Sequence, residues 1–222
     1  MIFKSMGKNS LLLAGFALIT AFILATTDQL TKDRIAESER VAAQRALFEI
    51  VPLERHNNDL LVDTQPIPKQ HWKALGLDKG GDVYIARHNE QPVAAIIPSV
   101  TAEGYSGDIA MIIGVNFDGS IAGVRVVEHR ETPGLGDKVD AKKSDWILEF
   151  NGKSLSNPEP SGWAVKKDRG DFDQFTGATI TPRAVIQQIA RTLKYFREDK
   201  ERILLAIQSS GAKAPAKQQA IQ

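Results

Sequence analysis

An uncharged run near the N-terminus limits how the rest of this chain can fold. No Asp, Glu, Lys or Arg occurs from Asn9 to Thr27, a stretch of 19 positions. A helix needs about 20 apolar residues to cross the hydrocarbon core of a bilayer, so the run predicts one transmembrane helix. No other stretch of the 222 residues is long and apolar enough to span a membrane. The remainder of the chain therefore has to build its own core in water.

The charges beside this run predict its orientation. Lys4 and Lys8 precede it, and a mixed set of charges begins at Asp28. Positive residues favour the cytoplasmic side, so we expect a single pass through the inner membrane with the soluble part on the periplasmic side. A cleaved signal peptide is the alternative, with Ala25-Thr26-Thr27 as a poor cleavage site. The run is longer than a typical signal core, which favours a retained anchor.

Hydrophobic periodicity predicts an α+β domain after the anchor. Segments rich in Val and Ile alternate with turn residues, among them Asp118-Gly119, a strong hairpin signal. They indicate an antiparallel sheet flanked by helices. The expected strands are 83–87, 93–100, 109–117 and 121–128, with a short strand at 162–167 and helices at 142–150 and 182–208.

The composition shifts along the chain give the expected organisation. An amphipathic pattern follows the anchor and stops at Pro52, and small polar residues dominate the end of the chain. The predicted parts are a short cytoplasmic N-terminus (1–8), a transmembrane helix (9–27), an amphipathic stalk helix (28–52), a soluble domain (53–208) and a disordered tail (209–222).

Composition excludes several classes of function. The chain has 28 Lys and Arg against 27 Asp and Glu, a net charge of +1 that argues against a nucleic-acid partner. It has no cysteine, which excludes disulfides and Fe–S clusters held by thiolates. Its four histidines lack the spacing of metal ligands, so no metal site is expected. Any redox chemistry would need a bound organic cofactor.

The most informative segment is Asp173-Gln174-Phe175-Thr176-Gly177-Ala178-Thr179, which Ile180-Thr181-Pro182 follows at once. Thr181 suits the N-cap of a helix, and Pro182 suits the first helical position. A helix N-terminus offers unpaired N–H groups and the positive end of a dipole, which favour a phosphate. Thr179 therefore stands where its hydroxyl is suited to carry a phosphate ester.

A second segment has the character of a ligand loop. Residues 129–136 read His-Arg-Glu-Thr-Pro-Gly-Leu-Gly, in which two glycines beside a proline allow the backbone to approach a planar ligand closely. A plain tight loop between a strand and a helix is the simpler interpretation. The glycine-flanked turn Gly104-Tyr105-Ser106-Gly107 has a similar character.

Taken together, these motifs resemble a known family. Residues 173–179 resemble the D-x-x-[S/T]-G-A-T motif at which flavin transferases attach FMN to threonine. With residues 129–136 and one span before a soluble domain, they resemble the FMN-binding subunits of membrane redox pumps. The nearest likeness is to the family of the G subunit in the Rnf electron transport complex. A related family is the C subunit in the sodium-pumping NADH:quinone reductase.

The resemblance implies a set of site residues. It implies covalent FMN on Thr179 through a phosphoester, with a transferase that uses FAD and its own Mg²⁺. It places the 131–136 segment beside the isoalloxazine ring, and Arg183 is the best-placed candidate for the phosphate. The implied cofactor-binding residues are Thr179, Thr176, Gly177, Ala178, Glu131, Thr132, Gly134, Leu135, Gly136, Tyr105 and Arg183.

The function implied by the resemblance is electron relay between reduced ferredoxin and NAD, coupled to movement of Na⁺ or H⁺. The chain would be one electron-transfer subunit among the membrane and peripheral subunits of a larger complex, not a stand-alone enzyme. Three alternatives stay open at this point. They are the quinone-reductase relative, an anchored scaffold without flavin, and a hydrolase with a threonine nucleophile, for which no base partner is visible.

Overall fold

The computed structural model describes residues 13–27 and 44–211, with side chains to residue 209. The predicted N-terminus 1–8, the first residues of the span (9–12), most of the stalk (28–43) and the tail from 212 lie outside the described residues. The chain divides into two units, Met1–Ala43 and Gln44–Gln222.

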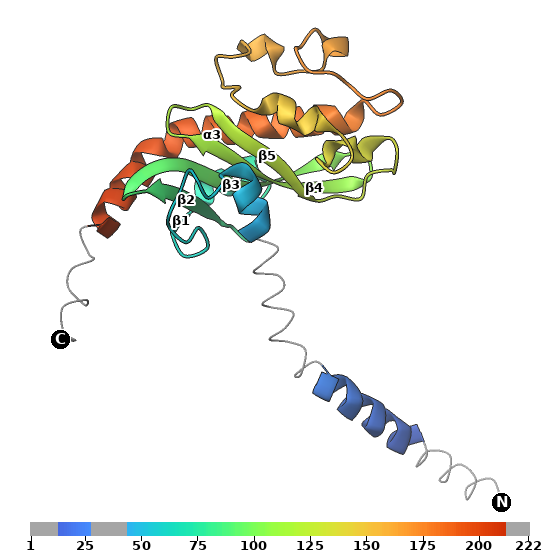
Figure 1. The fold of residues 1–222 in the computed structure, drawn as a ribbon. Helices are drawn as coiled ribbons and strands as arrows, with labels where there is room; N and C mark the ends of the chain where they lie inside the picture. The colour runs from blue at the N-terminus through green and yellow to red at the C-terminus, as the bar shows by residue number, and fades with distance from the viewer. Residues whose placement is uncertain (1–12, 28–43, 212–222) are drawn as a thin grey trace, which may run out of the picture. The chain divides into compact units, whose positions relative to one another are not determined.

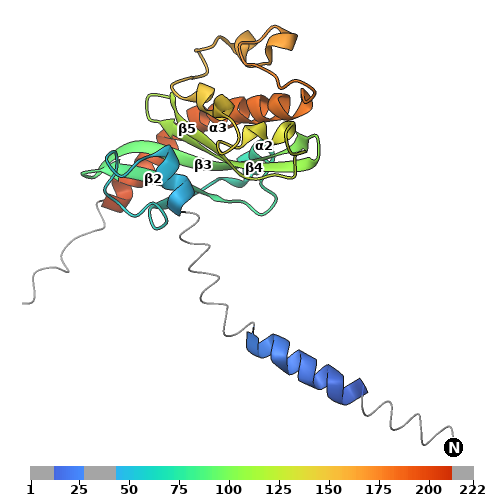
Figure 2. The ribbon, with the colours of Figure 1, turned by 45° about the vertical axis from the view of Figure 1, so that its right-hand side comes forward.

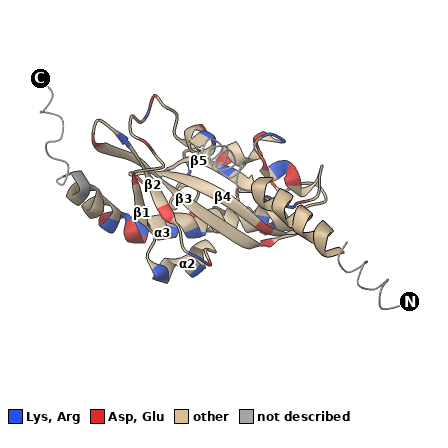
Figure 3. Cartoon of the chain, turned by 90° about the horizontal axis from the view of Figure 1, so that it is seen from below, with Lys and Arg blue, Asp and Glu red and all other residues tan. Residues whose placement is uncertain are grey.

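In the first unit, residues 13–27 form a helix without a single charged side chain (Figure 3). Its large apolar side chains are exposed, as Phe16 and Leu18 illustrate. Within the described ranges, no helix reaches the length and apolarity that a membrane crossing requires.

The second unit is built on one antiparallel sheet in which neighbouring strands follow the order of the chain (Figure 1). The four predicted strands are confirmed, and a short edge strand precedes them. Pro66 in that edge strand explains why the sequence pattern contains no strand signal there. The strands are β1 (Thr64–Pro66), β2 (Asp82–His88), β3 (Gln91–Gly104), β4 (Gly107–Asn116) and β5 (Ile121–Glu128).

The hairpin turns follow the chemistry of their residues. Asn89 and Glu90 join β2 to β3, and both have positive φ, 49° and 69°. That pair of angles matches a type I′ turn, whose twist suits a tight antiparallel hairpin. Tyr105 and Ser106 join β3 to β4, between the paired residues Gly104 and Gly107. The turn therefore places Tyr105 at the tip of the longest hairpin.

Alternation along the strands gives the sheet two buried faces. On β3, Ile97 belongs to the larger apolar cluster while its neighbour Ile96 belongs to a smaller one. On β4, Ile113 and Ile112 divide in the same way. Since successive side chains of a strand point to opposite faces, each cluster lies on its own side of the sheet.

The helix α3 (Ile180–Gly211) covers the face with the larger cluster, packing on β3 and β4 (Figure 1). This confirms the long helix predicted at 182–208, which begins two residues earlier and continues through 209–211, the first residues of the predicted tail. A short helix, α2 (Lys69–Leu75), packs against α3 and was not predicted. The apolar residues that recur at helical spacing along α3 are buried, namely Val185, Ile189, Leu193, Phe196 and Ile203.

The opposite face is covered by the helix at 44–50 and the loop after it. Leu47, Ile50 and Val51 are almost completely buried there. The approach to the sheet is close, because a Cβ built on Gly114 of β4 would lie 2.2 Å from Ile50 Cγ2. A glycine at this position of β4 is therefore what lets the helix reach the sheet.

The segment between β5 and α3 lies on the α3 side of the sheet and consists of short 3₁₀ turns (Figure 2). Two expectations were wrong here. Residues 142–150 contain a 3₁₀ turn in place of a longer helix, and 162–167 form no strand, because the chain turns back after a single bridge between Val165 and Phe172. Packing of Trp146, Phe150, Trp163, Phe172 and Phe175 against one another determines this path. The turns are η1 (Gly136–Val139), η2 (Asp145–Phe150), η3 (Pro160–Gly162) and η4 (Lys166–Asp168).

Candidate functional site

A cavity of about 330 Å³ opens where three distant segments of the chain meet. The β3–β4 turn contributes one side, the loop after β5 a second, and the entry to α3 a third. Its size falls near the lower end of the range, about 300–1,000 Å³, found for small-molecule sites. The lining residues are Tyr105, Glu131, Thr132, Leu135, Gly136, Gly177, Ala178, Thr179, Ile180 and Thr181.

The Glu131 side chain joins the three segments. It is only 5 % exposed. Its Oε1 accepts a hydrogen bond from the Ser106 N–H at 3.0 Å, and its Oε2 accepts one from the Thr181 hydroxyl at 2.5 Å. Hydrogen bonds to a charged acceptor are stronger than neutral ones, so this carboxylate fixes the turn at residue 106 to the start of α3.

Gly104 and Gly136 have no side chains and therefore leave room for the Glu131 carboxylate. A Cβ on Gly136 would lie 2.6 Å from Glu131 Oε2 and 2.9 Å from Thr181 Oγ1. A Cβ on Gly104 would lie 2.9 Å from Glu131 Oε1 and closer still to the backbone of Gly107. Neither position tolerates a side chain without movement of the carboxylate or of its partners. The second glycine of the 129–136 segment is thus needed for close packing.

The 173–179 motif forms a tight turn that leads into α3. Gly177 has φ of 80°, and the Ala178 N–H donates to the Phe175 carbonyl at 3.1 Å. A type II turn requires this positive φ at its third residue, so glycine suits the position. The Arg183 N–H points to the Thr179 carbonyl at 3.4 Å, which makes Thr179 the N-cap residue of α3.

This arrangement corrects one expectation. Thr181 was predicted as the N-cap, but α3 begins at Ile180 and Thr181 is its second residue. The Thr181 hydroxyl is fully buried and donates to Glu131 in place of capping the helix. Sequence spacing did not reveal this contact because its partners are 50 residues apart.

The motif is held from behind by the aromatic cluster. The Trp146 indole N–H donates to the Asp173 carbonyl at 2.9 Å, and the Phe175 ring packs on Trp146 with 5.0 Å between centroids. Phe175 is buried, whereas Thr176 and Gly177 are exposed. The turn therefore projects its small residues outward from a rigid base.

Two cations near the motif are already paired. The Arg183 guanidinium donates to both carboxylate oxygens of Asp168, at 2.5 and 2.7 Å, and Lys166 pairs with Asp173 at 2.8 Å. The hydrogen bond from Arg183 holds the pKa of the Asp168 carboxyl below its usual range. These pairs connect η4 to the start of α3 and to the motif, and none of the four residues lines the cavity.

The structure brings most of the sequence-predicted residues to one place. Tyr105, Glu131, Thr132, Leu135, Gly136, Gly177, Ala178 and Thr179 all line the cavity. Thr176 and Gly134 lie beside it in exposed turns, and Arg183 faces Asp168.

The lining also includes residues that the sequence did not single out for this role. Ile180 is 47 % exposed at the cavity, beside Tyr105 and Leu135, which are 69 % and 40 % exposed. Large exposed apolar side chains around a cavity are typical of a binding site. No grouping of His, Asp and Glu in the described ranges has the arrangement to hold a metal ion.

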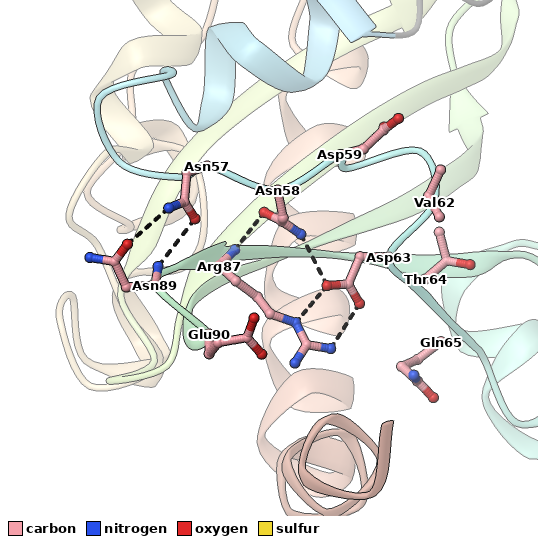
Figure 4. A pocket seen from close by; sticks show the side chains of 10 residues that line it. All are labelled: Asn57, Asn58, Asp59, Val62, Asp63, Thr64, Gln65, Arg87, Asn89 and Glu90. Carbon is pink, nitrogen blue, oxygen red and sulfur yellow. Dashed lines mark hydrogen bonds and ion pairs between the residues drawn. The ribbon is translucent and has the colours of Figure 1, made fainter. Parts of the chain in front are cut away.

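A larger, open cavity of about 840 Å³ lies elsewhere, between the loop at 57–63 with the start of β1 and the end of β2 with its turn (Figure 4). Its polar groups mostly bond to one another. Arg87 donates to both oxygens of Asp63 at 2.5 and 2.9 Å, and the Asn58 side chain bonds to Asp63 and to the Arg87 N–H. This network ties the loop to β2, so its main effect is structural.

Comparison with known proteins identifies the class of this domain. Residues 104–194 match the family model described as FMN-binding domain, a range that contains every residue lining the 330 Å³ cavity. Residues 1–50 match the model described as the RnfG N-terminal region. Residues 104–194 therefore belong to the FMN-binding domain family.

Full-length relatives narrow the family further. The chain is 46 % identical over 208 residues to the G subunit of the ion-translocating oxidoreductase complex from Pseudomonas aeruginosa strain UCBPP-PA14, covering 94 % of this chain and 96 % of that one. It is 50 % identical over 190 residues to the protein of that name from Shewanella amazonensis, covering 86 % and 87 %. The chain belongs to the RnfG family, the G subunits of ion-translocating oxidoreductase complexes.

Part of the chain is also similar to a solved structure. It is the C subunit of the Na⁺-translocating NADH-quinone reductase from Parabacteroides distasonis, 26 % identical, covering 53 % of this chain and 61 % of that chain. The TM-score of this match is 0.40.

Proposed function

We propose that this chain is a membrane-anchored electron carrier in which Thr179 bears FMN through a phosphoester bond. The observation that carries the proposal is the position of Thr179. It lines the cavity and is also the N-cap residue of α3, a helix of 32 residues. A phosphate on its hydroxyl would meet unpaired N–H groups and the positive end of the helix dipole.

The residues around the cavity fit this cofactor. Tyr105, Leu135 and Ile180 offer apolar surface for a flat ring, and the exposed turn at Thr176-Gly177 leaves room for a modifying enzyme. Across the described part of the chain, no hydrogen bond engages the Thr179 hydroxyl, whereas the Thr181 hydroxyl is held by Glu131. Of the hydroxyls near the turn, Thr179 is thus both unengaged and at the helix start.

Arg183 contributes differently from what the sequence suggested. Its guanidinium is bound to Asp168, so a role toward the phosphate would require that pair to open. We therefore assign the phosphate to the backbone N–H groups at the start of α3. Arg183 and Asp168 stabilise the position of η4 beside that helix end.

The chemistry of the bound group is electron transfer, since flavins pass electrons singly as well as in pairs. The chain positions the group and shields it. The relatives are named as components of an ion-translocating oxidoreductase complex. We infer the same assembly here, with the chain relaying electrons between other subunits and with Na⁺ or H⁺ as the coupled ion.

We further infer a single-pass anchor at residues 9–27 in the inner membrane, with the domain on the periplasmic side. The described part of this segment is helical and its large apolar side chains are exposed. With residues 9–12 the apolar run has 19 positions, which is close to the length a bilayer requires.

Intact-mass spectrometry of the chain produced together with a flavin transferase tests the attachment. We expect one added FMN, and flavin fluorescence that survives a denaturing gel. Thr179→Ala should remove both signals, while the matched control Thr176→Ser, which keeps a hydroxyl at the exposed position where the motif accepts serine, should keep them. A fluorescent Thr179→Ala protein would show that another residue carries the flavin. A colourless unaltered protein would favour the scaffold alternative.

A further inference from the structure

The charge distribution around the cavity is one-sided. Among the ten lining residues, Glu131 alone carries a charge. Both of its hydrogen-bond donors, the Ser106 N–H and the Thr181 hydroxyl, are neutral groups. Within the described residues Glu131 forms no ion pair, and two cations near the motif, Arg183 and Lys166, are bound to Asp168 and Asp173.

A second carboxylate strengthens this asymmetry. Asp137 follows Gly136 in η1 and is only 7 % exposed. Its Oδ1 is buried and has no hydrogen-bond partner among the described residues. The positive end of α3 lies at Thr179, where a phosphate would offset it. The segment 131–137, which supplies four of the lining residues, therefore contains two carboxylates and neither Lys nor Arg.

We propose that Glu131 lowers the reduction potential of the flavin that Thr179 carries, by holding an uncompensated negative charge at the wall of its cavity. The inference rests on the proposed function. Each electron that enters the ring adds one negative charge, unless a proton follows it. A like charge a few ångströms away in a shielded cavity disfavours that addition. Electrons then leave this flavin more readily for the next carrier.

The variant Glu131→Gln tests the charge with little change in shape. A glutamine keeps one oxygen to accept from the Ser106 N–H, and its NH₂ group can donate to the Thr181 hydroxyl, which accepts equally well. The three segments thus stay connected while the charge is lost. The matched control is Glu128→Gln, which removes an exposed carboxylate three residues earlier, at the end of β5.

The measurement is a potentiometric titration of the full chain in detergent, after intact mass has confirmed one FMN per chain. For Glu131→Gln we expect the equilibrium constant for reduction to rise at least about tenfold, because Coulomb's law at an effective dielectric constant of about 20 gives that factor at a separation of roughly 12 Å and a larger one at shorter range. A tenfold change corresponds to about 59 mV for one electron. Glu128→Gln should leave the potential unchanged.

A second variant distinguishes the effect of the Glu131 charge on the potential from the effect of a loosened cavity wall. Thr181→Val removes a donor to Glu131 but leaves the charge, which is then less well compensated. Its potential should lie at or below that of the unaltered protein. An unchanged potential in Glu131→Gln, or a raised potential in Thr181→Val, would overturn the inference. A missing FMN on the unaltered protein would instead show that the proposed function fails.

Discussion

Replacing Gly136 by alanine tests the packing around the Glu131 carboxylate. The new methyl group would lie 2.6 Å from Glu131 Oε2 and 2.9 Å from Thr181 Oγ1, both shorter than van der Waals contact. Either the carboxylate moves and its hydrogen bond to Thr181 weakens, or the loop moves away from α3. Both outcomes disturb the wall of the cavity.

The expected loss of stability follows from three contributions. Overpacking costs about 1–3 kcal/mol, and weakening a hydrogen bond to a charged group costs about 1.5–3 kcal/mol. Alanine also lowers the conformational entropy of the unfolded chain, which raises the free energy of unfolding by about 0.4–1 kcal/mol. The free energy of unfolding should therefore fall by about 1.5–5.5 kcal/mol. With an m-value of about 2 kcal/mol per molar urea, the midpoint falls by roughly 0.7–2.8 M.

The assay is urea unfolding followed by circular dichroism, with Gly134→Ala as the control. Gly134 has φ of 78° and open space around it, so alanine there adds only backbone strain, about 1 kcal/mol. Removing the Glu131 side chain should relieve the crowding. In a Glu131→Ala background, Gly136→Ala should therefore lower the free energy of unfolding by less than it does in the unaltered protein. Strictly additive effects of the two changes would refute the close contact.

Two further predictions concern other parts of the domain. Arg87→Met leaves the Asp63 carboxylate partly buried without its bidentate partner. The free energy of unfolding, measured in urea, should therefore fall by about 3–5 kcal/mol. Changing both residues to apolar ones should lower it by less than the sum of the two single changes. If the loss of stability in the double variant equals the sum of the two single losses, the two side chains are not coupled. Burial, with the nearby Asp199 charge, raises the pKa of the Tyr195 hydroxyl well above its ordinary value of about 10. The unfolded tyrosine ionises first, so the stability that this group contributes is complete below about pH 10 and is lost at higher pH. Tyr195→Phe should flatten the fall in the urea midpoint between pH 8 and pH 11, and an unaltered slope would show that other groups cause it.

The sheet could be predicted because its physical signals are local. Strands β2 to β5 alternate between two buried faces and are joined by glycine- or asparagine-containing turns. The edge strand β1 has only three residues and includes Pro66, so no alternation could develop. The helix α2 is seven residues long and has no polar side chain at its N-cap. Short elements of this kind are stabilised by tertiary contacts, which a sequence pattern does not contain.

The segment at 142–170 shows a different limit. Its aromatic residues correctly indicated a core, since Trp146 and Phe150 are buried. Their mutual packing, however, favours short 3₁₀ turns over a helix and a strand. The backbone of Gly170 approaches Ala164 so closely that a Cβ would meet its carbonyl oxygen at 2.0 Å. Such an approach depends on the path of the whole segment.

The site was predictable as a set of residues but not as a geometry. The glycine-rich loop and the threonine motif each have a local reason for their residue types, and both line one cavity. The contact of Glu131 with Thr181 and Ser106 joins positions 50 and 25 residues apart, for which no spacing rule exists. The pairing of Arg183 with Asp168 is likewise a tertiary event. The hydrogen-bond and charge partners of a site residue are therefore identified from the three-dimensional structure and not from the sequence.

The helix at 44–50 has a practical consequence for anyone who wishes to study the domain without its anchor. Leu47 and Ile50 fill one side of the sheet, and the glycine at 114 leaves the space that receives them. A shortened protein that starts after residue 52 would present that apolar face to solvent and would be prone to precipitate. Cleavage sites or affinity tags should accordingly be placed ahead of Gln44.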